Sequence, residues 1–223
     1  MSTHSSWNKG RAEVLLFCQR MLNEKLVYYT AGNISCRIEG EPEQIAITPA
    51  AMAYDTMQPE DIVILTINGQ VVNGKHQPTS ELPLHTLVYQ RRPDIGAVVH
   101  THSSAGMAMS ALGATLPPIL IGLVTGAGGS IVTAPFARAG TAEMAELTAE
   151  ALEDRSACFI RNHGVLAIGV TLSDAYTAAT AVESTAEAYL KAVTVGQVVE
   201  IPAEEIERLR LKWKSQWQKE VTP

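Results

Sequence analysis

The chain has 223 residues, of which 46% are hydrophobic and 18% charged, with a formal net charge of −6. This length suits one large domain or two small ones and is enough for a full core, and no Lys- or Arg-rich block points to nucleic acid. The polar N-terminus lacks the apolar core of a signal peptide, and prolines and glycines interrupt the most apolar stretch, so we expect no membrane segment. Three scattered cysteines predict no disulfide framework and favour a reducing, cytoplasmic location.

The N-terminal half is predicted to alternate between helices and short strands. In chain order we expect a helix over 7–27, strands over 34–38 and 43–48, a hairpin over 62–72 with its turn at Asn68-Gly69, a helix over 80–91, a strand over 96–101 and a helix over 104–112.

The C-terminal half continues this alternation, which predicts an α/β fold in a single domain covering residues 1–223. In chain order we expect strands near 118–124 and 130–133, a helix over 140–154, two strands within 158–169 that meet at a tight bend, a helix that begins at Thr171 or Ser173 and runs to about 195, and a helix over 202–218.

Two histidines, His100 and His102, stand two residues apart at the end of an apolar run. Alternation along a strand places both on one face, so both imidazoles can reach one ion. A third histidine at the Asn-His-Gly bend, His163, could complete three corners of a tetrahedral zinc site. The alternative is that all three are structural and bonded to the backbone.

The segment PTSE, residues 78–81, offers hydroxyls and backbone N–H groups at a predicted helix start, which suits an anion. Glu81 falls in the first turn of that helix, either as an acid/base carboxylate or fourth metal ligand, or as a charge that favours the helix dipole. His85 lies four residues later on the same helix face, where it could hydrogen-bond to Glu81 and orient it. The turn at Gly32 and Asn33 allows close approach of a ligand, or forms a plain helix C-cap.

Five motifs follow one another along the chain: TAGNIS (30–35), ITP (47–49), QPTSELPLH (77–85), PDIGAVVHTH (93–102) and RNHG (161–164). In these motifs the chain resembles the class II aldolase/adducin family over residues 10–215. The resemblance implies a three-layer α/β/α fold around a mostly antiparallel sheet. It also implies a homotetramer with active sites at subunit interfaces.

The resemblance further implies Zn²⁺, or another divalent metal such as Mn²⁺ or Co²⁺, with His100, His102, His163 and Glu81 as its ligands. Glu81 would also move the proton during turnover. The positions that match the family's phosphate-binding residues are Gly32, Asn33, Thr79 and Ser80.

The implied activity is cleavage of a small sugar phosphate, or a related hydroxy-carbonyl compound, by retro-aldol chemistry through an enediolate. A 4-epimerase or decarboxylase on the same metal site is the alternative enzyme, and an adducin-like scaffold without catalysis is the alternative of another class. All four metal-ligand positions are kept, which favours an enzyme. After ITP the family usually has a hydroxyl residue and glycine, whereas this chain has Ala50 and Ala51, so phosphate binding is expected to differ.

Overall fold

One eight-stranded sheet, in the order β4-β3-β2-β1-β5-β8-β7-β6, forms the centre of the protein in a computed structural model that describes residues 3–221. The strands are β1 Asn33–Ile38, β2 Glu41–Ile47, β3 Val63–Thr66, β4 Val71–Asn73, β5 Ala97–Thr101, β6 Thr133–Ala134, β7 Ala157–Ile160 and β8 Gly164–Gly169. The helices are α1 Thr3–Asn23, α2 Leu82–Arg91, α3 Ser104–Leu112, α4 Ile121–Ala127, α5 Ala142–Leu152, α6 Leu172–Val193 and α7 Ala203–Val221, with a 3₁₀ turn at Pro59–Asp61.

The sheet is mixed. The pair β6–β7 is parallel, and the other strand pairs described are antiparallel. The α/β class is thereby confirmed, and the short connections β1–β2, β3–β4 and β7–β8 are the hairpins that local turn residues allow. The expected turn at Asn68-Gly69 joins β3 to β4, with Gly69 at φ 85°.

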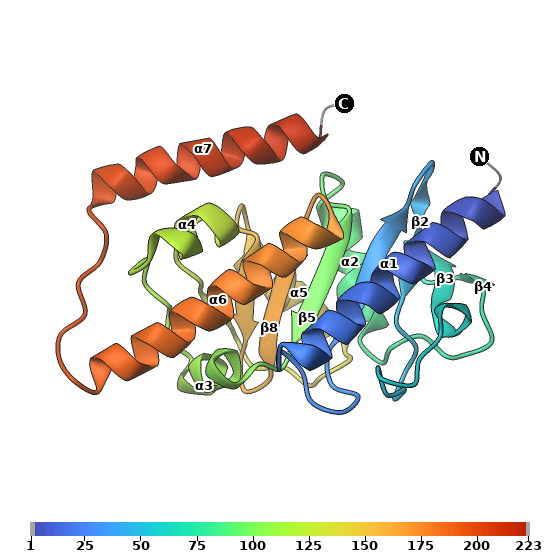
Figure 1. Cartoon of the computed structure of the whole chain (residues 1–223), viewed down its shortest axis with the longest axis horizontal. Coiled ribbons are helices and arrows are strands. Elements are labelled where there is room, and N and C mark those ends of the chain that lie inside the picture. Colours follow the sequence, from blue (N-terminus) through green and yellow to red (C-terminus); the bar gives the residue numbers. More distant parts are fainter. Residues whose placement is uncertain (1–2, 222–223) are drawn as a thin grey trace.

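Helices cover both faces of the sheet, with α1 and α6 crossing one face and α2 and α5 lying behind it (Figure 1). Side chains along each central strand alternate between two apolar clusters. Val99 packs with α1 and α6, whereas its neighbour Val98 packs with α2 and α5. In β8, Ala167 and Leu166 divide in the same way. This alternation is the physical basis of the three layers.

The expected strand near 118–124 is wrong: helix α4 covers Ile121–Ala127. Leu123, Val124 and Ala127 are buried there while Ile121 is exposed, which is a helical spacing within a short apolar run. The run is too short for its periodicity to separate a helix from a strand, and its glycines favoured the wrong choice. The other expected helices and strands are present, with ends shifted by a few residues.

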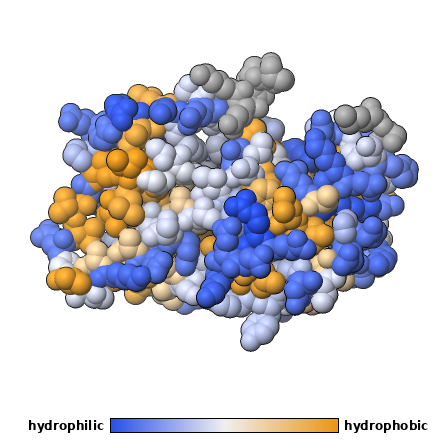
Figure 2. All heavy atoms as spheres, viewed as in Figure 1, coloured by the Kyte–Doolittle hydropathy of each residue, from blue (hydrophilic) through white to orange (hydrophobic). Residues whose placement is uncertain are grey.

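Exposed apolar side chains gather at the end of the molecule that holds α4, as the space-filling view in the orientation of Figure 1 shows (Figure 2). They come from the start of α4 with its N-cap residue, and from the segment between α6 and α7, and include Leu120, Ile121, Val195 and Val199. Within the described chain, no helix combines the length and the apolar character needed to cross a membrane.

Candidate active site with a histidine cluster

Strand register brings the three histidines together. In the middle of the sheet, His100 on β5 pairs with Asn33 on β1 on one side and with Leu166 on β8 on the other. His163 lies in the tight turn between β7 and β8, so the hairpin carries it to the end of β5. A Cβ at Gly164 would lie 2.3 Å from the Thr101 carbonyl oxygen, so glycine is required for this close approach.

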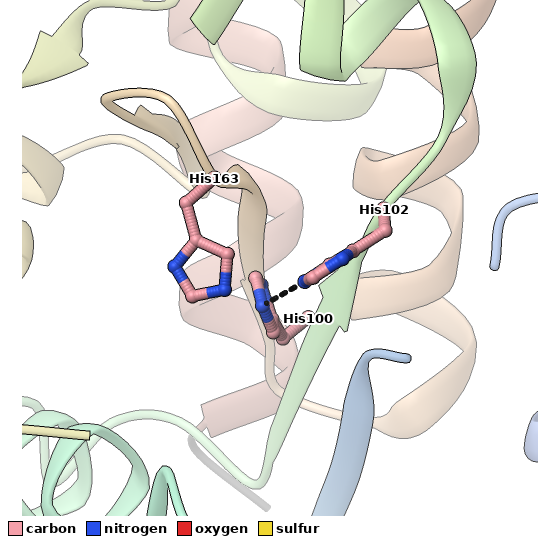
Figure 3. A group of neighbouring side chains, drawn as sticks. All are labelled: His100, His102 and His163. Carbon is pink, nitrogen blue, oxygen red and sulfur yellow. Dashed lines mark hydrogen bonds between the residues drawn. The ribbon is translucent and has the colours of Figure 1, made fainter. Parts of the chain in front are cut away.

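The imidazole rings of His100, His102 and His163 face one another around a common point (Figure 3). One ring nitrogen from each lies within 4.8 Å of the others. His100 is fully buried, and its Nδ1 lies 2.9 Å from the Val165 carbonyl oxygen, so Nδ1 donates to that oxygen and Nε2 faces the cluster. The Nε2 atoms of His100 and His102 are 2.9 Å apart. Ring nitrogens that converge on one point are the arrangement that a divalent metal requires.

Glu81 closes the cluster from the side of α2. Its Oε2 lies 3.1 Å from His100 Nε2 and its Oε1 lies 3.3 Å from His163 Nε2. The residue is buried, and Oε1 is without a hydrogen-bond partner among the described side chains. A buried carboxylate oxygen with no donor is costly, and a cation between it and the imidazoles would remove that cost. The expected set of four ligand residues is therefore assembled in one place.

The charges within the cluster are coupled: burial would lower the pKa of His100, but the adjacent Glu81 carboxylate raises it above its usual value. Burial would raise the pKa of Glu81, but His100, His163 and the amide of Asn33 stabilise the carboxylate and hold that pKa well below its usual range. Burial, together with the neighbouring imidazoles, lowers the pKa of His102 to about 3 and that of His163 to about 4. At neutral pH Glu81 is ionised and these two rings are neutral, as metal ligands must be.

Glu81 is the N-cap of α2, with φ −95° and ψ 19°, and does not lie within its first turn as expected. Its side chain therefore leaves the helix face on which His85 lies, and the expected direct bond between Glu81 and His85 is wrong. Asn33 stands between them: its Nδ2 donates to Glu81 Oε2 at 2.7 Å, and its Oδ1 accepts from His85 Nε2 at 2.5 Å.

The hydrogen-bonded chain continues behind His85, with Ser35 Oγ 2.7 Å from His85 Nδ1 and 3.0 Å from the Tyr89 hydroxyl. Burial lowers the pKa of His85 to about 3, so the ring is neutral. Because Nε2 donates to Asn33, Nδ1 must accept from Ser35, and Ser35 in turn accepts from Tyr89. Every donor in this buried chain therefore points toward the Glu81 carboxylate, which stabilises its charged form.

A cavity of about 220 Å³ opens beside Glu81, His102 and His163. All four residues expected to bind phosphate line it: Gly32, Asn33, Thr79 and Ser80. Their loops are joined by backbone bonds, from Thr79 N to Thr48 O at 3.0 Å and from Ala50 N to Gln77 O at 2.9 Å. The ITP segment and the PTSE segment therefore form one wall, on which Ala50 and Ala51 are exposed.

The lining also includes Ala139, which was not identified from the sequence. Ala139 belongs to the loop between β6 and α5. Its neighbour Gly140 has φ 74°, and a Cβ there would lie 2.8 Å from the Ser80 carbonyl oxygen. The glycine thus lets this loop close against the PTSE segment. Its positive φ is a signal only once the fold is known.

Comparison with known proteins agrees with this geometry. The family described as Class II Aldolase and Adducin N-terminal domain matches residues 12–190. The chain belongs to this family. It is 34% identical over 206 residues to a 5-deoxy-D-ribulose 1-phosphate aldolase of Bacillus thuringiensis serovar kurstaki, covering 92% of this chain and 96% of that one. It is 35% identical over 198 residues to an L-fuculose phosphate aldolase of Escherichia coli K12, covering 89% and 90%.

A solved structure of an L-fuculose 1-phosphate aldolase superposes on this chain with a TM-score of 0.88 at 32% identity. The superposition covers 92% of this chain and 96% of that one. The fold expected from the resemblance and the prediction of a carbon–carbon lyase of the class II aldolase type are confirmed at this level.

Proposed function

We propose that this class II aldolase cleaves a ketose 1-phosphate with the help of a divalent metal, Zn²⁺ in the first place. The observation that carries the proposal is the convergence of three imidazole nitrogens within 4.8 Å, next to the buried Glu81 carboxylate, on a cavity lined by anion-binding loop residues. Nitrogen and oxygen ligands of this kind suit zinc, and also Co²⁺ and Mn²⁺. When bound, the metal would supply a Lewis acid for the carbonyl oxygen of the substrate.

In the proposed reaction the bond between C3 and C4 of the ketose breaks. Its electron pair stays with the ketone half as an enediolate, the C4 hydroxyl loses its proton, and C4 becomes the carbonyl carbon of an aldehyde. A proton then returns to C3 to give dihydroxyacetone phosphate. We assign the proton transfer at C3 to Glu81, the carboxylate at the edge of the cavity.

The phosphate would lie against the loops that carry Gly32, Thr79 and Ser80, with Asn33 between phosphate and carboxylate. Asn33 Nδ2 has two hydrogens and donates one to Glu81, so the other is available to a ligand. The Bacillus thuringiensis relative and the solved structure described above are named as aldolases of 5-deoxy-D-ribulose 1-phosphate and L-fuculose 1-phosphate, which supports this substrate class. Ala50 offers no hydroxyl to the phosphate, so we expect fewer side-chain donors there.

The first experiment measures exchange of a C–H proton of dihydroxyacetone phosphate in heavy water, by NMR, with zinc-loaded protein. Stereospecific loss of one proton, abolished by a chelator, is the expected result, and it needs no aldehyde. The His163→Ala variant should lose both zinc and exchange. The His76→Ala control should keep both, because His76 lies outside the cavity, 2.9 Å from Asp61. Assays of the condensation of dihydroxyacetone phosphate with two- and three-carbon aldehydes then identify the aldehyde half of the substrate.

Absence of exchange in a zinc-containing protein would contradict a phosphorylated donor. Pyruvate and other unphosphorylated donors would then be tested, since Ala50 and Ala51 would leave the anion site weak. Formation of the C4 epimer of the ketose, in which the C3–C4 bond breaks and re-forms on the opposite face of the aldehyde, would instead favour the 4-epimerase.

We also propose a cytoplasmic homotetramer whose active sites lie at subunit interfaces. Two features support it: Tyr29 and Phe136, on the chain segments that lead into the cavity lining, are 87% and 67% exposed, and apolar side chains gather near α4. Exposed apolar patches of this kind mark interaction surfaces. The buried free thiols of Cys18, Cys36 and Cys158 suit a reducing compartment. Sedimentation analysis tests the tetramer.

A further inference from the structure

Glu183 lies on α6, outside the cavity, and its carboxylate accepts two backbone hydrogen bonds from the start of α3. Ala105 N donates to Oε1 at 3.0 Å and Gly106 N donates to Oε2 at 2.8 Å. These are two of the N–H groups that a helix leaves unpaired at its first turn. The glutamate therefore acts as a cap supplied from a distant helix, with its charge at the positive end of the α3 dipole.

The residue that normally provides this cap does not do so. Ser103 is the N-cap of α3, and serine is a favoured residue there, but its side chain makes no capping bond. Its Oγ is buried and has no partner among the described residues. Gly106 leaves room for the arrangement, since a Cβ there would lie 2.8 Å from Ser103 Oγ and 2.5 Å from Val165 Cγ2.

The start of α3 matters because it directly follows the histidine cluster. His100 lies within β5 and is paired with strands on both sides. His102 lies beyond the last residue of β5, and its backbone N donates to Leu26 O at 3.0 Å. The next fixed point along the chain is the first turn of α3. His102 is thus the histidine of the β5 pair that lies outside the strand ladder.

We propose that Glu183 is a positioning residue for the metal centre: by capping α3 it fixes the backbone that presents His102. The inference rests on the proposed metal site. Glu187, one turn further along α6, provides the contrast, because it is exposed and pairs with Lys191 at 2.6 Å. Sequence alone places both glutamates on one face of a long helix and does not distinguish them.

The test compares Glu183→Gln with Glu187→Gln in the full-length protein. Both changes remove one charge from α6, but only the first replaces a carboxylate oxygen facing a backbone N–H by an NH₂ group. We expect Glu183→Gln to weaken zinc binding about 10- to 100-fold in competition with a chelator, as loss of a residue that orients a ligand does. The visible spectrum of the Co²⁺-substituted protein should shift in the same variant. Glu187→Gln should match the wild type in both measurements.

An unchanged zinc affinity and cobalt spectrum in Glu183→Gln, even with a lower melting temperature, would overturn the inference and leave the proposed metal site intact. A wild-type protein that binds neither zinc nor cobalt would instead overturn the proposed function and the inference with it. Should Glu183→Gln fail to fold, Glu183→Asp provides the measurement. It keeps the charge but is one methylene shorter, and it should also weaken zinc binding.

Discussion

The two ends of the cavity are built in different ways. At the histidine end, His100 and Glu81 are 0% and 6% exposed, and strand pairing or buried hydrogen bonds fix each group. At the anion end, Ser80, Ala50 and Ala51 are exposed on loops. Loops tolerate substitution far better than paired strands do. We therefore propose that the histidine end carries the chemistry and that the anion end selects the substrate.

The largest effect is expected from Glu81→Gln, which keeps the shape of the side chain but removes the proton acceptor. We expect turnover and proton exchange to fall by about 10²- to 10⁴-fold, while zinc is retained by the three imidazoles. Glu146→Gln is the control, because Glu146 is an exposed partner of Arg91. Exchange within tenfold of the wild type in Glu81→Gln would transfer the role of base to another group.

The next effect tests the buried chain behind the carboxylate. His85→Ala removes the link between Ser35 and Asn33 and leaves both with unpaired polar groups, so Asn33 no longer holds Glu81 in place. We expect turnover to fall by about 10- to 100-fold with zinc content nearly unchanged, measured by metal analysis on the same samples.

Equal losses of zinc and turnover in His85→Ala would contradict a purely orienting role. The loss of buried hydrogen bonds also lowers the free energy of unfolding by about 1–3 kcal/mol, so the variant is assayed well below its melting temperature. Ser35→Ala interrupts the same chain one step earlier. It should reduce turnover in the same direction and by less.

These two predictions also mark what sequence can establish. Spacing by two at a strand end sufficed to predict that His100 and His102 share a site, but strand alternation does not place His102, which lies beyond the end of β5. The i,i+4 spacing of Glu81 and His85 misled, because Glu81 caps the helix and does not lie within it. No local pattern indicates that Asn33, 48 residues from Glu81, stands between them. That contact depends on the register of β1 against β5.

The cavity wall shows the same limit. The turn residues of the PTSE and TAGNIS segments are compatible with an anion site and with plain helix caps, and the resemblance to the family, not the pattern, selected the anion site. Ala139 was not identified, because an alanine in a loop carries no signal until the fold places it opposite Ser80. The spacing of Glu183 and Glu187 places both on one helix face. Only the packing of α3 against α6 shows that Glu183 caps a helix, whereas Glu187 is a surface charge.

A smaller effect is expected at the anion end. Ser80→Ala removes one exposed hydroxyl that lines the cavity, which is worth about 0.5–1.5 kcal/mol for a single hydrogen bond. We expect KM for the phosphorylated donor to rise by up to about tenfold, with kcat and zinc content unchanged. Ser184→Ala, on the exposed side of α6, is the control. A fall in kcat without a change in KM would place Ser80 in the chemistry, against the division proposed here.

The smallest effect concerns backbone strain at Ala51, which has φ 53°, a region that disfavours any residue with a Cβ. Glycine removes this penalty, so Ala51→Gly should raise the free energy of unfolding by about 0.5–1 kcal/mol, after allowance for the greater freedom of glycine in the unfolded chain. Ala53→Gly is the control, because Ala53 is not among the residues with positive φ, and it should lower the same quantity. Both are measured by denaturant unfolding of the zinc-loaded protein.

If Ala51→Gly were destabilising like its control, the loop would not be strained at this position. A stabilised variant whose KM for the phosphorylated donor also falls would show that the added Cβ, and not only the missing hydroxyl of Ala50, keeps the backbone away from the anion.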